Sequence, residues 1–135
     1  MYSPTPVLRG VEVPDPALRA CLQEVISAES ITRTEELKIL NCSHAGISDL
    51  SGLAAFNALE RLKLSANEIR NLVELEKLTA LRELILDKNR IVDPVPLYRL
   101  PHLTRLDLSG NPGLQCPREA GFAAVNSVLL PAHCN

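Results

Sequence analysis

The sequence predicts an α/β solenoid, in which a short array of coils carries a parallel β-sheet on its concave face and is closed by a helical cap at one end and a second cap at the other. Two observations predict this fold. Leucine and asparagine each recur with a period of 22 residues, at Leu37, Leu59, Leu81 and Leu103 and at Asn67, Asn89 and Asn111. A unit of this length holds one strand and one short return segment, and it buries its apolar side only by stacking on its neighbours.

Composition sets the broad class of the chain. It has 135 residues, 46% of them hydrophobic and 22% charged, which is typical of a globular protein with a core. The formal net charge of -2 leaves no broad basic surface for phosphate groups, so nucleic acid is not expected as a ligand. The apolar runs fall far short of the roughly 18 residues that a membrane span needs, so no membrane insertion is expected.

Each repeat is expected to contribute one strand. The consensus Leu-x-x-Leu-x-apolar-x-x-Asn-x-apolar is complete in the copies that begin at Leu59 and Leu81. The two leucines of the Leu-x-Leu part point to the same side of a strand, and the residues between them face water. The first copy departs from the consensus, with Cys42 in place of a leucine and Ala45 in place of the asparagine.

The repeated asparagines are predicted to be structural. A side-chain amide at the end of each strand can bond backbone groups of the following turn, which the coil would otherwise bury unpaired. Asn67, Asn89 and Asn111 are therefore expected to form a ladder along the array.

The flanking segments are expected to close the ends of the array, because the terminal coils would otherwise expose a slab of leucine. Residues 1–13 are predicted to be extended, and residues 14–36 to form a helical cap with Asp15 as N-cap and Pro16 at the first helical position. The four repeats occupy residues 37–114 and a C-terminal cap residues 115–135, all within one structural domain. In that cap we expect a short helical stretch over residues 117–125 and an apolar patch, Val128 to Leu130, packed on the fourth coil.

Residues 37–114 resemble leucine-rich repeats of the 22-residue class, the type found in internalin-like bacterial proteins and in intracellular phosphatase-regulator proteins. The helix that follows Asp15 resembles the cap that opens internalin-like arrays. The C-terminal segment departs from the four-cysteine cap of eukaryotic extracellular arrays, because it has only Cys116 and Cys134. The resemblance implies a bacterial protein that binds another protein.

Four cysteines allow three pairings, and the repeat register narrows them. Cys42 takes an inward position in the first strand, Cys21 lies on the helix expected to pack over that strand, and Cys116 and Cys134 bracket the C-terminal cap. We predict the disulfides Cys21–Cys42 and Cys116–Cys134, which favour an extracellular, cell-surface or periplasmic location even though no signal peptide is visible. The alternative is four free thiols, as in a cytosolic protein.

No catalytic residue, metal site or cofactor is predicted. The three histidines have no serine, aspartate or cysteine partner at a spacing that the coils would bring together. The sequence contains no Cys-x-x-Cys, His-x-x-x-His or Gly-rich phosphate-binding motif. We therefore expect a protein that is not an enzyme.

The candidate binding face consists of the outward side chains of the strands, because stacked strands present them to a partner as a flat array. Aligning the copies gives Ile39, Asn41, Arg61, Lys63, Glu83, Ile85, Asp87, Arg105 and Asp107. Adjacent strands lie about 4.8 Å apart. Arg61, Glu83 and Arg105 are therefore expected to form a cross-strand charge ladder, Lys63 is expected to reach Asp87 diagonally, and Ile39 and Ile85 supply the apolar points.

The sequence supports two functions. The first is an exported, monomeric protein–protein interaction module that binds a protein of unknown identity on the concave sheet. The alternative is a structural or display spacer of a surface protein with no ligand of its own. An intracellular phosphatase-regulator-like scaffold ranks third, because its caps would not need four cysteines.

The cysteine pairing predicts a specific mass change. Reduction of the native chain should add the mass of four hydrogen atoms, and no cysteine should react with an alkylating reagent before reduction. Intact-mass measurement with and without reductant checks this, and four thiols that can be alkylated in the native protein would contradict it.

Overall fold

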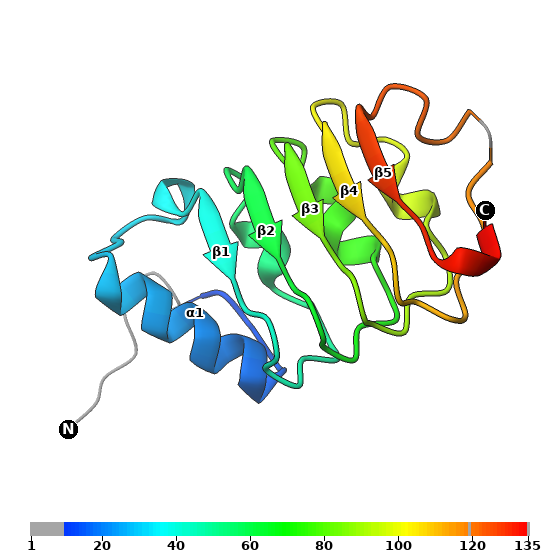
Figure 1. Ribbon diagram of the computed structural model, residues 1–135. Coiled ribbons are helices and arrows are strands. Elements are labelled where there is room, and N and C mark those ends of the chain that lie inside the picture. The colour runs from blue at the N-terminus through cyan, green and yellow to red at the C-terminus, as the bar shows by residue number, and fades with distance from the viewer. Residues whose placement is uncertain (1–9, 119, 135) are drawn as a thin grey trace.

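The computed structural model describes residues 10–118 and 120–134 and has one α-helix followed by a five-stranded parallel sheet (Figure 1). The strands follow one another across the sheet in chain order, as in a solenoid, so the predicted fold class is confirmed. The elements are α1 (Pro16–Ala28), β1 (Ile39–Asn41), β2 (Arg61–Lys63), β3 (Glu83–Ile85), β4 (Arg105–Asp107) and β5 (Ser127–Leu129).

Short 3-10 helices form the return path of the coils. Those of the central coils lie behind the sheet, on the convex side of the solenoid (Figure 1). A 3-10 turn needs few residues, so a strand, two bends and a return turn fit within one repeat. The 3-10 helices are η2 (Thr34–Glu36), η3 (Leu53–Ala55), η4 (Val73–Lys77), η5 (Val95–Leu97) and η6 (Ala132–Cys134).

The strands pair in register with the sequence repeat. Leu62 pairs with Leu40 on one side and with Leu84 on the other, and Leu106 continues the row. All four leucines are at most 1% exposed, since the same side of every strand faces the core between the sheet and the 3-10 helices. The repeat spacing therefore sets both the pairing and the buried side.

The three repeated asparagines bridge successive coils. The Asn89 side-chain amide donates to the carbonyl oxygens of Leu64 (2.9 Å) and Leu86 (3.1 Å), and its oxygen accepts from the Ile69 backbone N–H (3.1 Å). Asn67 and Asn111 make equivalent bonds at their own positions in the ladder. All three asparagine side chains are buried. Each asparagine thus satisfies backbone groups of its own coil and of the preceding one.

A residue with a left-handed backbone precedes each ladder asparagine and also precedes Ala45, which has the equivalent position in the first coil. His44, Ala66, Lys88 and Gly110 have φ between 55° and 70°, and they are spaced 22 residues apart like the asparagines. This conformation turns the chain sharply after the strand. It costs a residue with a Cβ roughly 1–2 kcal/mol. His44 thus belongs to the sharp turn that follows β1 in the first coil.

Asp15 joins α1 to the first coil. One carboxylate oxygen accepts from the backbone N–H groups of Ala17 and Leu18 and caps the helix, at 2.9 and 3.1 Å. The other oxygen accepts from the N–H groups of Ser48 and Asp49, at 2.9 and 3.0 Å. Four donors on one buried carboxylate fix where the helix begins and where it packs.

The C-terminal segment differs from the prediction. The expected helical stretch over residues 117–125 is wrong: the described part of it forms turns and irregular backbone, and β5 follows and pairs with β4. Val128 lies 22 residues after its partner Leu106, so the repeat period extends one strand further than we assigned it. Leu129 does not pack on the fourth coil, because it takes an outward position and is 50% exposed.

Three parts of the predictions fall outside the described residues. They are residues 1–9 of the expected extended segment, Glu119 of the expected helical stretch and Asn135 of the expected C-terminal cap. The division into caps and repeats at residues 13, 36 and 114 stays a prediction.

Replacing the central ladder asparagine should destabilise the fold. Asn89→Leu is more apolar, yet it leaves the Leu64 and Leu86 carbonyls and the Ile69 N–H with one partner fewer in a buried place. We expect the free energy of unfolding in urea to fall by roughly 1–3 kcal/mol. The exposed residue Asn57, changed to leucine, is the matched control and should alter stability little. A variant Asn89→Leu as stable as the parent would contradict a structural ladder.

The Asp15 carboxylate predicts a loss of stability in acid. Burial opposes its ionisation, but the four backbone donors outweigh burial and lower its pKa below the ordinary carboxyl value. Because the pKa is lower folded than unfolded, ionised Asp15 stabilises the fold above the unfolded value of about 3.9, and this is lost as pH falls through the folded pKa. Asp15→Asn should lower stability at pH 7 and weaken the pH dependence below about pH 5. Urea unfolding at several pH values checks this against the exposed control Glu24→Gln, and identical pH profiles for parent and Asp15→Asn would contradict it.

Candidate functional site

The outward side chains of the sheet form two straight rows, which together we call the concave face. The central residues of β1 to β4 are buried, so the residues on either side of them lie on the opposite face of the sheet, and Figure 1 shows the 3-10 helices of the central coils behind the sheet. Strand pairing places the first and third residue of every strand side by side. The rows are Ile39, Arg61, Glu83, Arg105 and Ser127, and Asn41, Lys63, Ile85, Asp107 and Leu129.

All predicted residues of the binding face except Asp87 lie in these rows. Asp87 lies two residues beyond the end of β3, where its carboxylate accepts a hydrogen bond from the Ser65 hydroxyl. Ser127 and Leu129 belong to the face as well, and the sequence analysis missed them because it placed residues 115–135 in the cap. The signal was present, since both lie 22 residues after Arg105 and Asp107.

The exposed apolar side chains of the face lie on its first and last strands, β1 and β5. Ile39 in β1 is 57% exposed and Leu129 in β5 is 50% exposed. Ile85, expected to be a central apolar point, is only 8% exposed, because it lies mid-sheet between Lys63 and Asp107. A partner would therefore meet apolar side chains at the rims and polar ones in the centre.

The predicted charge ladder is wrong in its contacts. Arg61, Glu83 and Arg105 are neighbours in register, but no ion pair within 4.0 Å joins them, nor Lys63 to Asp87, in the part of the chain that the structure describes. Exposed pairs gain about 1 kcal/mol or less, too little to hold long side chains together.

Ion pairs form instead between the residues that directly precede the strands. Glu60 lies 3.6 Å from the Lys38 ammonium and 3.8 Å from the Arg82 guanidinium. Arg61, Lys63 and Arg105 are exposed and are joined to no carboxylate within 4.0 Å among the described residues.

Two carboxylates of the candidate site already have partners. Asp87 accepts from the Ser65 hydroxyl, and Asp107 accepts from the backbone N–H (3.0 Å) and the hydroxyl (2.6 Å) of Ser109. These bonds use acceptor capacity that a partner could otherwise reach. Among the described residues, the charged groups of the face without such a bond are the three cations and the half-buried Glu83.

Both predicted cysteine pairs lie at disulfide distance. The sulfur atoms of Cys21 and Cys42 are 2.06 Å apart, and those of Cys116 and Cys134 are 2.12 Å apart. The first pair links α1 to the residue that follows β1, and the second links the loop after the fourth coil to η6. Each end of the array is thus crosslinked.

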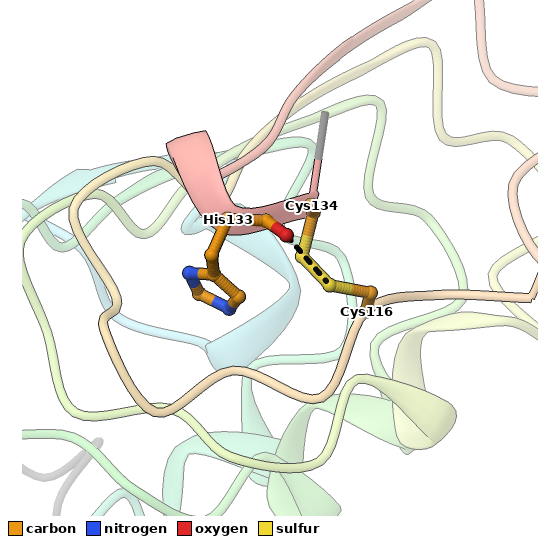
Figure 2. A group of neighbouring side chains, drawn as sticks. All are labelled: Cys116, His133 and Cys134. Carbon is orange, nitrogen blue, oxygen red and sulfur yellow. Dashed lines mark hydrogen bonds between the residues drawn. A yellow bond between two sulfur atoms is a disulfide. The ribbon is translucent and has the colours of Figure 1, made fainter.

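The second cysteine pair forms a group of potential metal ligands together with His133 (Figure 2). The ligand atoms of Cys116, His133 and Cys134 all lie within 4.8 Å of one another. No metal site was predicted here, because Cys116 lies 17 residues before His133 and no compact motif links them. The adjacent pair His133-Cys134 was the only signal.

Comparison with known proteins shows the fold. No protein-family model matches the sequence, and no curated protein sequence matches it. An internalin (inlF) from Listeria monocytogenes matches 96% of this chain with a TM-score of 0.80 at 23% sequence identity. Internalin C2 (inlC2) from the same organism matches 71% of this chain with a TM-score of 0.64 at 29% identity. This chain has the leucine-rich repeat fold of the internalins.

The internalin-like array is short beside those structures. The chain covers 39% of the length of the first internalin and 42% of the second.

Within the described residues, no helix combines the length and the apolar character that crossing a membrane requires. The leucine-rich repeat fold in general supports a protein-interaction module.

Proposed function

We propose that this internalin-like array is a non-enzymatic protein-interaction module whose partner binds the concave face. The observation that carries the proposal is the set of exposed cations Arg61, Lys63 and Arg105, which have no carboxylate within 4.0 Å among the described residues. Unpaired charges on a rigid surface are available to a partner without first breaking a bond. Arginine is also among the residues that most often dominate binding energy at interfaces.

The arrangement favours a partner with acidic groups and two apolar contacts. Arg61 and Arg105 lie two strands apart, which separates their backbones by about 10 Å. Ile39 and Leu129 mark the ends of the sheet and would contact apolar side chains at the rims. Complementary charge raises the association rate and selects the partner more than it raises affinity.

We propose that the module acts outside the cytoplasm, in the extracellular space, at the cell surface or in the periplasm. Two disulfides support this, because they persist in oxidising compartments and are rare in the cytosol. Their position at the two ends of the array suits a small domain that must stay folded there.

Charge reversal on the concave face tests the binding proposal. The double variant Arg61→Glu and Arg105→Glu should lose a protein that the parent captures from an envelope extract, as measured by quantitative mass spectrometry. Lys77→Glu with Arg99→Glu is the matched control, because it reverses two exposed charges that lie outside the concave face. The control should capture the same protein as the parent.

The captured protein is then tested in purified form. Its association rate with the parent should fall as salt rises, and the concave variant should lose this dependence. Equal capture by the parent and the concave variant would contradict the proposed site. No concave-dependent partner would favour the alternative, a structural or display spacer.

A further inference from the structure

We propose that Cys116, His133 and Cys134 form a binding site for a thiophilic divalent metal ion of the zinc class when the disulfide between the two cysteines is reduced. The three residues gather at the C-terminal end of the array, and Figure 2 shows the imidazole of His133 beside the sulfur pair. The disulfide and the metal site are alternative states of the same residues. The proposal is independent of the concave face.

The donor set and its spacing suit zinc. Thiolate and imidazole are the ligands that zinc prefers, and three protein ligands leave a fourth position for water. With Zn–S near 2.3 Å and Zn–N near 2.1 Å, donor atoms around a tetrahedral ion lie roughly 3.5–4 Å apart. The three ligand atoms already lie within 4.8 Å of one another, so small side-chain movements suffice.

Exposure distinguishes this disulfide from the other one. Cys116 is exposed and Cys134 is half-buried, so a reductant can approach the bond from solvent. In the other disulfide, Cys42 is 3% exposed and belongs to the core cluster, and Cys21 is half-buried. Because exchange depends on access to the sulfur atoms, the outer bond should open first.

His133 is held near the sulfurs but not packed in the core. It lies 22 residues after Asn111, at the ladder position of a fifth coil, yet it is exposed. Its Nε2 lies 2.8 Å from the Leu114 carbonyl oxygen. The residue also lines an open hollow of about 470 Å³ together with Pro112 and Pro131.

The chemistry balances with a dithiol as reductant. The dithiol transfers two electrons and two protons to the Cys116–Cys134 bond and is itself oxidised to a disulfide. A divalent ion then displaces the two thiol protons and binds the two thiolates. Neutral His133 donates a nitrogen lone pair, and water takes the fourth position.

Cobalt binding to the full chain tests the proposal. Mild treatment with dithiothreitol, followed by alkylation and peptide mapping, should label Cys116 and Cys134 before Cys21 and Cys42. The selectively reduced chain should then bind one Co²⁺ with thiolate-to-metal absorption, release about two protons per ion near pH 7, and exchange Co²⁺ for Zn²⁺. Bound Zn²⁺ should protect Cys116 and Cys134 from alkylation, and the oxidised chain should show no such absorption.

The matched variant is His133→Asn, which keeps an amide donor near the Leu114 carbonyl but removes the imidazole. Its affinity for Co²⁺ should fall by at least about tenfold, since even loss of an outer-shell partner costs roughly 10–100-fold. Circular dichroism of the reduced parent and variant verifies that both are folded. Equal affinity in His133→Asn, no thiolate absorption in the selectively reduced parent, or opening of both disulfides at the same rate would overturn the proposal.

Discussion

The structure depends on satisfying backbone groups at the turn that follows each strand. Every coil leaves the sheet through a sharp corner beside a leucine core, where water cannot reach the N–H and C=O groups. Asn67, Asn89 and Asn111 solve this problem, since each amide donates to carbonyls of two coils and accepts an N–H of the coil before it. These bonds hold the coils at one spacing and one register, and so determine where every outward side chain stands.

The two ends of the array show what happens where this ladder stops. The first coil has Ala45 in place of asparagine, and its backbone N–H is satisfied from the next coil by the Asn67 oxygen, at 3.0 Å. On its other side, Asp15 bonds both the helix and the coil, and the Cys21–Cys42 disulfide crosslinks them. At the far end His133 has the sequence position of the asparagine, but its Nε2 lies beside the Leu114 carbonyl oxygen, and the Cys116–Cys134 disulfide closes the last loop.

The same geometry decides which polar side chains of the surface are bonded within the protein and which are available to a partner. The carboxylates of Asp87 and Asp107 are bonded to serines, whereas Arg61, Lys63 and Arg105, at the ends of β2 and at the start of β4, are exposed to solvent. At the C-terminal end of the described residues, Cys116 and His133 are exposed and Cys134 is half-buried. The available groups therefore gather on the concave face and at the final loop.

The sequence by itself determined the backbone plan. The leucine and asparagine period predicted the solenoid, the strand register and the buried side, because each coil must repeat the same contacts with its neighbours. The register also predicted the pairing of Cys21 with Cys42 and of Cys116 with Cys134, now found at disulfide distance. Local signals at Asp15 and Pro16 predicted the start of α1, since capping is a local interaction.

Tertiary structure alone decided the surface and the last strand. Arg61 and Glu83 stand in register without pairing, and Ile85 is nearly buried while Leu129 is exposed, because weak contacts with neighbours decide such positions. Residues 127–129 keep the 22-residue spacing but lack the leucine and asparagine consensus, and their pairing with β4 is what makes them a strand. The predicted Cys116–Cys134 pair placed His133 near Cys116, but only the fold shows that the three ligand atoms lie within 4.8 Å of one another.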